Sequence, residues 1–359
     1  QLLQACAGAH TIVTASRESV ADRPDLHDDA SAIVLNIVEP GWRSSTKGRS
    51  VEVLRTLTAG QSIDSYRLMR PLQTEARVWL AHSTDDRLRV LKFPPIDAFD
   101  DELRRDGFVR EMWNVTRVDS PDFIRAQIPL EGSLRYYTMD YVEAPTVRDI
   151  LKKSPLAVEE TIVLAQTLLR AAQFLLSHDL AHGDLKPDNI LRAADSPAPK
   201  FILLDLGSAA EIFSVTNRAG TPSYLAPERF RGGALSERTE IFSIGVILYE
   251  VLTRTYPYGE IERFQTPSFE RTPRRPSQLN AAIPLWLEAI TLKAIAANPN
   301  DRYQNFSELV FDLDHPSKVA AYVRCDAPLL ERNPLLFYKS MSLFLLLACA
   351  VLVYLLAHK

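Results

Sequence analysis

Two periodicities follow each other along the chain. Residues 63–93 alternate between apolar and polar over short stretches separated by turns, which predicts strands at 66–69, 77–81 and 88–93. Beyond residue 100 the spacing becomes that of helices, predicted at 101–118, 147–153 and 158–178. In the strand at 88–93 the alternation places Val90 and Lys92 on the same face. The pattern therefore predicts a strand-rich region followed by a helical one.

Both ends of the chain differ from this central region. Residues 28–38 have the β-branched composition of a buried strand, and residues 41–62 are polar enough to be a linker. Residues 340–357 carry no charge and are rich in Leu, Ala, Val and Phe, which predicts a transmembrane helix. A buried amphipathic helix is the alternative, but no polar stripe interrupts the run. Residues 317–339 would then be a juxtamembrane segment.

Composition narrows the class of protein. The chain has 359 residues, of which 46% are hydrophobic and 24% charged, and this balance fits a globular protein with a large core. The net charge of -4 argues against a nucleic-acid-binding protein. The three cysteines are too scattered for a disulfide framework or a metal site and favour a reducing cytoplasm. Because the chain begins at Gln1, we expect it to be a fragment with further sequence upstream.

The candidate chemistry is concentrated in residues 182–191, His-Gly-Asp-Leu-Lys-Pro-Asp-Asn-Ile-Leu, and 203–207, Leu-Leu-Asp-Leu-Gly. These segments supply a carboxylate at Asp184, a cation at Lys186, an amide at Asn189 and a second carboxylate at Asp205. Oxygen ligands suit a hard metal ion bound to phosphates, and a further carboxylate can accept the proton of an attacking hydroxyl. The spacing is typical of a phosphoryl-transfer site.

With these motifs in this order, residues 63–316 resemble a Ser/Thr protein kinase, close to bacterial membrane-anchored kinases. The resemblance implies an α+β, two-lobed kinase fold with a small antiparallel-sheet lobe and a large helical lobe. It implies transfer of the γ-phosphoryl group of ATP, with Mg²⁺ or Mn²⁺, to Ser or Thr hydroxyls of proteins. It assigns Asp184 as catalytic base, Lys186 to the transferred phosphate, and Asn189 and Asp205 to the metal.

The resemblance also implies a nucleotide pocket. Lys92 is the phosphate-contacting lysine, and its partner is Glu111 rather than Glu102, whose place near a helix start is explained by the helix dipole. The residues expected around the adenine are Val78, Val90, Met139, Asp140, Val142 and Leu191.

Residues 220–228, Gly-Thr-Pro-Ser-Tyr-Leu-Ala-Pro-Glu, resemble the platform on which Ser/Thr kinases bind protein substrates, with Thr221 at its start. The resemblance pairs Glu228 at its end with Arg302 in a structural ion pair. His-Gly-Asp also resembles aminoglycoside-type phosphotransferases, a rival enzyme class in which this platform is not expected.

Three positions depart from the kinase pattern. Residues 72–77 contain no glycine where kinases have a glycine-rich loop, so we expect weaker contact between backbone and phosphates. Gly183 stands where regulated kinases have Arg, and Glu240 stands where Asp is usual. The main alternative function is therefore a membrane-anchored pseudokinase scaffold that binds nucleotide without transfer.

Residues 28–38 loosely resemble the last strand of a PPM-type phosphatase, so residues 1–40 would be the C-terminal remnant of such a domain, and by that resemblance Asp28 is a metal ligand. An ordinary acidic loop before an edge strand is the alternative. Some bacterial proteins join such a phosphatase to a kinase and a membrane helix, so the expected partners include an upstream phosphatase domain, ATP, protein substrates and the membrane. The expected location is the inner membrane, single-pass, with the kinase domain in the cytoplasm.

Overall fold

A computed structural model describes residues 56–96, 102–129, 136–194, 199–206, 209–211, 220–262, 267–322 and 334–357. The predicted phosphatase remnant at 1–40, with Asp28, and most of the predicted linker at 41–62 lie outside the described residues.

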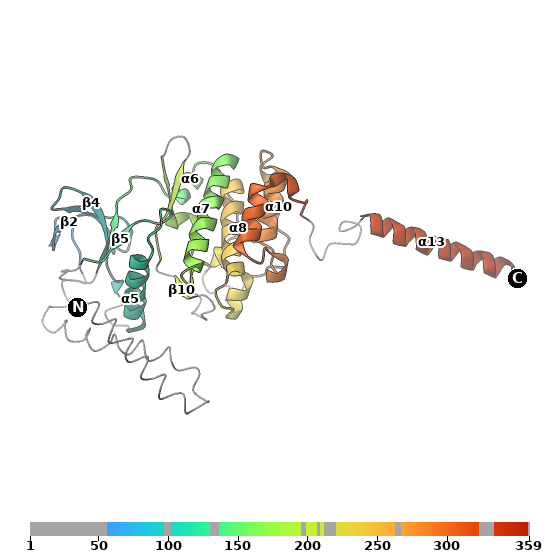
Figure 1. The fold of residues 1–359 in the computed structure, drawn as a ribbon, viewed down its shortest axis with the longest axis horizontal. Coiled ribbons are helices and arrows are strands. Elements are labelled where there is room, and N and C mark those ends of the chain that lie inside the picture. Colours follow the sequence, from blue (N-terminus) through green and yellow to red (C-terminus); the bar gives the residue numbers. More distant parts are fainter. Residues whose placement is uncertain are drawn as a thin grey trace, which may run out of the picture. The chain divides into compact units, whose positions relative to one another are not determined.

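The first part of the described chain is an antiparallel sheet with the strand order β1-β2-β3-β4-β6-β5 (Figure 1). The three strands predicted between residues 63 and 93 are present, and a β-bulge between Leu68 and Arg70 shifts the register of the β2–β3 pair. Helix α5 follows β4 in the chain, and its Phe108 ring stacks on Tyr137 of β6 with 5.9 Å between the ring centroids. The bounds are β1 Ser62–Ile63, β2 Tyr66–Pro71, β3 Val78–Ser83, β4 Leu88–Lys92, α5 Glu102–Arg117, β5 Ala126–Gln127 and β6 Tyr137–Asp140.

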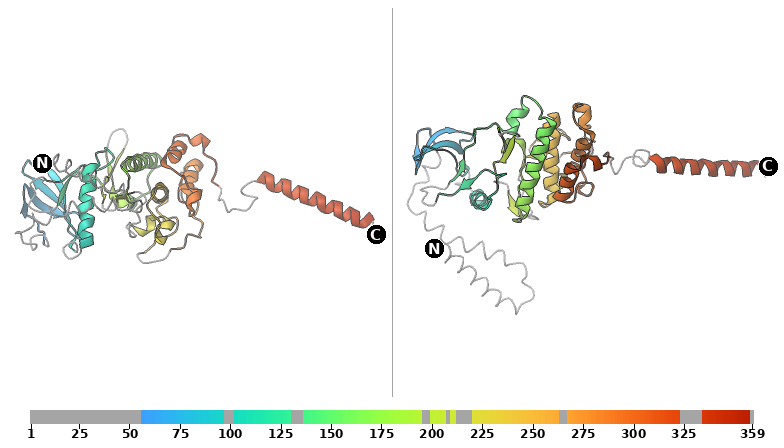
Figure 2. Two further views of the ribbon diagram at one scale, coloured as in Figure 1. Left: turned by 60° about the horizontal axis from the view of Figure 1, so that its bottom comes forward. Right: turned by 45° about the horizontal axis from the view of Figure 1, so that its top comes forward.

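The second part is helical, and α7, α8 and α10 lie side by side in both views of Figure 2. The helices are α6 Val147–Leu151, α7 Val158–Leu176, α8 Glu237–Thr253, α9 Pro276–Leu279, α10 Leu285–Ala294, α11 Phe306–Asp314 and α13 Pro334–Ala357. Two short hairpins pair β7 Leu180–Ala181 with β10 Ala210–Glu211, and β8 Ile190–Ala193 with β9 Lys200–Leu203. Short 3₁₀ helices are η2 Pro187–Asn189, η3 Pro222–Tyr224, η4 Pro227–Arg231, η5 Pro299–Asp301 and η6 Pro316–Lys318. The predicted order of a sheet region followed by a helical region is confirmed.

Helix α8 is the centre of the helical part. Every residue from Thr239 to Leu252 is buried, and Ser236 begins the helix with a capping box shared with Thr239. A Cβ atom on Gly245 would lie 2.7 Å from the Ala294 Cβ and 2.8 Å from a methyl carbon of Ile295. The small residue therefore lets α8 approach the end of α10 closely.

Helix α13 begins six residues before the predicted transmembrane segment at 340–357 and ends with it. Large apolar side chains on it, including Leu343, Phe344 and Val353, are exposed. Over the ranges that the structure describes, none of the helices meets the length and apolarity required of a membrane span, so the predicted transmembrane helix is not confirmed.

A carboxylate from α8 holds the loop that follows β7. Glu240 Oε2 accepts the N–H of His182 and Oε1 accepts the N–H of Gly183, each at 3.1 Å. Gly183 has φ = 76°, in the left-handed region that glycine adopts without steric cost. The longer side chain at position 240 therefore still ties α8 to the loop that carries Asp184, where a shorter Asp had been the expected residue.

Arg302 joins η5 to η4 through a partly buried ion pair, in which the arginine is the buried partner. Its Nη1 and Nη2 donate to the two carboxylate oxygens of Glu228 at 2.7 and 2.8 Å, and its Nε donates to the Ala296 carbonyl at 2.7 Å. The side chain of Arg302 is 0% exposed, and its guanidinium lies 4.8 Å from the centre of the Phe242 ring. The pair predicted between Glu228 and Arg302 is thus made in the structure as a two-point contact.

Replacing Arg302 by Met should lower the free energy of unfolding by about 3–5 kcal/mol, because Glu228 would keep a partly buried charge without its partner and three backbone carbonyls would lose their donor. Urea unfolding followed by circular dichroism measures this change. Lys152→Met is the control, because Lys152 and Asp149 form an ion pair at 2.8 Å whose side chains are 67% and 52% exposed. That exposed pair should contribute about 0–1 kcal/mol. Equal losses in the two variants would contradict the prediction.

The stability of the fold should fall as pH rises through neutrality. Burial raises the pKa of the Glu240 carboxyl to about 7 from its ordinary 4.5, although the N–H groups of Gly183 and His182 oppose the shift. A group with a raised folded-state pKa contributes stability fully below about pH 4.5, and that contribution is lost as pH rises through about 7. The loss should reach about 3 kcal/mol, at about 1.4 kcal/mol per pKa unit.

Glu240→Gln removes the ionisable group and keeps the shape of the side chain. Its free energy of unfolding, measured from pH 5 to pH 8, should therefore be flatter than that of the unmutated chain, whatever constant penalty the amide adds. Parallel pH curves for the two proteins would contradict the assignment to Glu240.

Candidate active site

Lys92, Glu111 and Asp205 meet although they come from β4, α5 and the segment after β9. The Lys92 Nζ atom lies 2.5 Å from Glu111 Oε1 and 2.9 Å from Asp205 Oδ1. Lys92 is the last residue of β4 and pairs in register with Val78 of β3 and Tyr137 of β6. The sheet therefore sets the position of the ammonium group, and α5 and β9 bring the two carboxylates to it.

In this cluster one ammonium group lies between two carboxylates. Burial lowers the pKa of Lys92, but the charges of Asp205 and Glu111 outweigh it, so the pKa of the ammonium lies above its ordinary value. Burial raises the pKa of Glu111 despite the attraction of Lys92, and the charge of Asp205 adds to the increase. The Tyr137 hydroxyl donates to Glu111 Oε1 at 2.5 Å. The ammonium thus stays protonated and available to a third anionic group.

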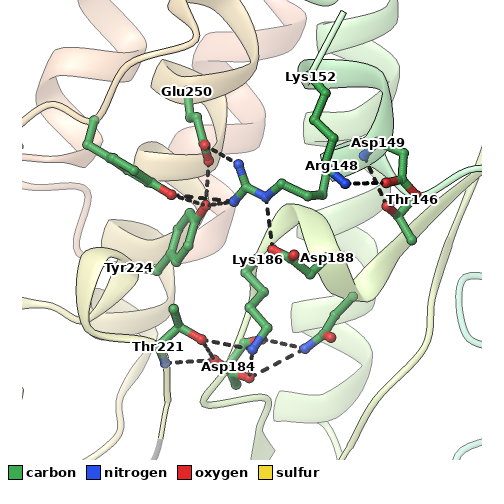
Figure 3. A network of polar contacts seen from close by, with 12 residues as sticks. Thr146, Arg148, Asp149, Lys152, Asp184, Lys186, Asp188, Thr221, Tyr224 and Glu250 are labelled. Atoms are coloured by element: carbon green, nitrogen blue, oxygen red, sulfur yellow. Dashed lines mark hydrogen bonds and ion pairs between the residues drawn. The ribbon is translucent and has the colours of Figure 1, made fainter. Parts of the chain in front are cut away.

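Asp184 is held by both oxygens of its carboxylate (Figure 3). Oδ1 accepts the N–H and the hydroxyl of Thr221, each at 2.8 Å, and Oδ2 accepts Lys186 Nζ at 2.7 Å. Lys186 Nζ also donates to Thr221 Oγ1 at 2.8 Å. The predicted base, the predicted phosphate contact and the start of the predicted substrate platform therefore form a single hydrogen-bonded cluster.

Asn189 and Asp205 lie at the base of the β8–β9 hairpin, which starts with the Ile190–Leu203 pair. The Leu204 N–H donates to the Asn189 carbonyl at 2.9 Å, which ties the two segments together. Asn189 Nδ2 donates to the Asp184 carbonyl at 3.1 Å, so the amide nitrogen faces the loop and the amide oxygen remains as an acceptor. One carboxylate and one amide oxygen fit a Mg²⁺ ion that takes its other ligands from phosphates and water.

The residues predicted around the adenine come from four strands, β3, β4, β6 and β8, and from the segment after β6. Val78, Val90 and Leu191 are each 8% exposed, and Met139 pairs in register with Val90. The N–H of Asp140 donates to the Arg125 carbonyl at 3.0 Å, and its carboxylate forms an ion pair with Arg89. The Val142 carbonyl accepts the N–H of Ala144 at 3.0 Å. The Asp140 N–H and the Val142 carbonyl therefore already have partners within the chain.

The turn without glycine at residues 72–77 is closed by its own hydrogen bonds. The Ala76 N–H donates to the Gln73 carbonyl at 3.0 Å, and the Trp79 indole donates to the Ala76 carbonyl at 2.7 Å. Ala76 has φ = 49°, a left-handed conformation that costs about 1–2 kcal/mol in a residue with a Cβ atom. Arg77 is buried, and its Nε donates to the Pro94 carbonyl. The turn is thus anchored to the sheet.

Sequence reasoning missed the Tyr137 hydroxyl and the contacts of Arg148. Tyr137 could have been found, since it lies opposite Lys92 once the strands are paired in register. Arg148 donates to Asp188, Glu250 and Tyr224. Glu250 lies 102 residues further along the chain, and no local pattern indicates that contact.

Comparison with known proteins places the chain in a family. A sequence model described as the protein kinase domain matches residues 76–311. The serine/threonine-protein kinase PknB of Mycobacterium leprae is 33% identical over 220 residues, which are 57% of this chain and 35% of that protein. The serine/threonine-protein kinase PknD of Chlamydia felis is 29% identical over 252 residues, which are 61% of this chain and 27% of that protein. The chain therefore spans about a third or less of the length of these relatives. Because the kinase-domain model covers well over half of its residues, the chain belongs to the protein kinase family.

Proposed function

We propose that the chain is an ATP-dependent serine/threonine-protein kinase. The observation that carries the proposal is the position of Lys92, whose ammonium lies within 3 Å of carboxylate oxygens on both Glu111 and Asp205. A strand, a helix and the segment before the platform have to be placed together to make this contact. The names of the relatives PknB and PknD, both serine/threonine-protein kinases, support the same substrate class.

In the proposed reaction, a Ser or Thr hydroxyl oxygen forms a bond to the γ-phosphorus of ATP as the bond from that phosphorus to the bridging oxygen of ADP breaks. Asp184 takes the hydroxyl proton through Oδ2, because Oδ1 already accepts two hydrogen bonds from Thr221. Oδ2 accepts Lys186 at 2.7 Å and only a long contact of 3.4 Å from Asn189, which an acceptor hydroxyl would displace. Lys186 contacts the transferred phosphoryl group, and Lys92 contacts the other phosphates. The protein forms no covalent bond in this reaction, so the rate would depend on how it positions the two substrates and stabilises charge on the phosphates.

The nucleotide and metal assignments are part of the proposal. Asn189 and Asp205 would hold Mg²⁺, or Mn²⁺, which neutralises charge on the phosphates when bound. Glu111 fixes Lys92, and the adenine would lie among Val78, Val90, Met139 and Leu191, next to the backbone of Asp140 and Val142. Thr221 would begin the substrate platform, and the Glu228–Arg302 pair would stabilise its end.

The remaining assignments concern the whole protein. We propose a kinase domain at residues 63–316, a juxtamembrane segment at 317–339 and a membrane tether at 340–357 that keeps the kinase domain at the cytoplasmic face of the inner membrane. The tether rests on the uncharged sequence of residues 340–357 and on the exposed apolar side chains of α13. An upstream phosphatase domain, of which residues 1–40 would be the end, rests on sequence resemblance alone.

The one alternative is a pseudokinase scaffold, and it stems from the turn at residues 72–77, where side chains in place of glycine would limit close approach of the backbone to the phosphates. Such a scaffold would bind nucleotide and transfer nothing. The intact set of Lys92, Glu111, Asp184, Asn189 and Asp205 supports the enzyme instead.

Asp184→Asn should greatly slow transfer of labelled phosphate to a generic protein acceptor, because an amide cannot accept the hydroxyl proton. The expected loss in kcat is about 10²–10⁴-fold, with nucleotide affinity retained. The full chain, purified in mild detergent, is incubated with labelled ATP, Mg²⁺ and dephosphorylated casein. Asp86→Asn is the matched control, because Asp86 lies in the exposed β3–β4 turn and the change is chemically the same. Nucleotide binding by the unmutated chain without any transfer would instead support the scaffold.

The full chain, expressed in bacteria, should sediment with membranes and remain there after alkaline carbonate washing. Each Leu, Phe or Val near the centre of a span favours insertion by about 0.3–0.6 kcal/mol, and residues 340–357 contain many of them. A chain that ends at residue 333 is the control and should stay in the supernatant. Release of the full chain by carbonate or by high salt would contradict a membrane tether.

A further inference from the structure

Arg148 connects α6 to three other parts of the helical region (Figure 3). Its Nε donates to Asp188 Oδ2 at 3.1 Å, its Nη1 donates to Glu250 Oε1 at 2.5 Å, and its Nη2 donates to the Tyr224 hydroxyl at 2.5 Å. These partners belong to η2, α8 and η3. Asp188 lies two residues after Lys186, and Tyr224 lies three residues after Thr221.

The contact between Tyr224 and Glu250 completes this cluster. The Tyr224 hydroxyl accepts from Arg148 and donates to Glu250 Oε2. Burial raises the pKa of Tyr224, as does the charge of Glu250, so the hydroxyl keeps the proton that it donates. Glu250 is 4% exposed and Tyr224 is 2% exposed. Two buried polar side chains therefore share one guanidinium group, and the Tyr256 hydroxyl adds longer contacts of 3.5 Å to Arg148 Nη2 and to the Tyr224 hydroxyl.

The short helix η3 is held at both ends by groups next to the predicted chemistry. At its start, Thr221 donates two hydrogen bonds to Asp184. At its end, the Tyr224 side chain reaches Arg148 and Glu250, and the Tyr224 carbonyl accepts from Ser243 Oγ at 2.8 Å. The backbone between them is closed by a bond from the Tyr224 N–H to the Thr221 carbonyl at 3.0 Å.

We propose that Arg148 is a positioning residue for the protein acceptor: by binding Asp188, Glu250 and Tyr224 together, it sets residues 221–224 at a fixed distance from the loop that carries Asp184 and Lys186. The inference rests on the proposed kinase function and adds a determinant of how the acceptor, rather than ATP, is placed. Arg148 acts through Tyr224 and Asp188 and contacts neither Asp184 nor Lys92 in the structure.

The shape of the arginine side chain matters to this role as well as its charge. A guanidinium presents Nε, Nη1 and Nη2 in a rigid plane, and Arg148 uses each of the three nitrogens for a different residue. A lysine ammonium is a compact point charge and cannot reach three acceptors in these directions. Arg148→Lys therefore keeps the charge and removes the geometry.

The test compares Arg148→Lys, Tyr224→Phe, the double variant and Arg170→Lys in the full chain. Arg170 is the matched control, because it makes a two-point contact with Asp122 from α7, away from η3. Initial rates are measured with casein and with Mg-ATP varied separately, which gives KM for each substrate and kcat. Hydrogen exchange at the Thr221 and Tyr224 amides is measured in the same proteins, and this readout does not depend on activity.

Arg148→Lys and Tyr224→Phe should each lower kcat/KM for casein by about 10- to 100-fold and leave KM for Mg-ATP within about twofold, as expected when an acceptor is misplaced by a fraction of an ångström or more. Exchange at the two amides should become faster, and the double variant should be little worse than the poorer single one. Arg170→Lys should resemble the unmutated chain.

Three results would overturn the inference. One is an Arg148→Lys variant whose kinetic constants and amide exchange rates equal those of the unmutated chain. That result would mean that only the charge of Arg148 matters. Another is an equal loss of Mg-ATP affinity, which would indicate general damage. If Arg148→Lys fails to fold, Tyr224→Phe decides, and normal kinetics in that variant would overturn the inference. In each of these cases, phosphate transfer by the unmutated chain would still support the proposed kinase function. If the unmutated chain transfers no phosphate, both the proposed function and this inference are overturned.

Discussion

Burial of α8 is the constraint on which the rest of the helical part depends. A helix buried from Thr239 to Leu252 has to satisfy every polar group that it carries, and this one carries two carboxylates. Glu240 reaches the backbone of His182 and Gly183, and Glu250 reaches Arg148 and Tyr224. Ten residues of helix separate the two carboxylates by about 15 Å. The helix therefore holds the loop of Asp184 from one end and the platform from the other.

An ion pair joins the sheet to the helical part, in addition to the apolar contacts between them. Lys92 ends a strand of the sheet, and Asp205 follows a strand of the β8–β9 hairpin. A hydrogen-bonded ion pair of this kind is sensitive to small displacements, because its hydrogen bonds need a narrow range of distances and angles. Correct placement of Lys92 therefore requires that the sheet, α5 and the hairpin all take their positions, and the cluster depends on the whole domain being folded.

The sequence predicted what local spacing determines. The strands around Lys92, the helix that carries Glu111 and the segment from His182 to Leu191 follow from periodicity and from motifs a few residues long, and the structure has them within a residue or two. Contacts between distant segments could not be predicted from local patterns. The exceptions, such as Glu228 with Arg302, came from the resemblance to kinases. Arg148 with Glu250 has no local signature, because its geometry arises only after α6 and α8 pack. The span at residues 340–357 was predicted from composition alone, and it is not confirmed, because none of the described helices meets the requirements of a membrane span.

At two of the departures from the kinase pattern, neighbouring residues hold the backbone in an unusual conformation. At Gly183 the backbone takes a left-handed conformation, and the longer Glu240 side chain meets the two N–H groups that this conformation presents. In the turn at residues 72–77, Ala76 adopts a left-handed conformation without being glycine, and the Trp79 indole and the buried Arg77 hold it there. A strained residue persists only when its surroundings fix it. The first departure leaves the loop of Asp184 anchored, whereas the second puts a fixed turn where the kinase pattern has a glycine-rich loop. In the proposed reaction, capture of the nucleotide phosphates would then rest more heavily on Lys92 and on the proposed metal ligands Asn189 and Asp205 than on backbone amides.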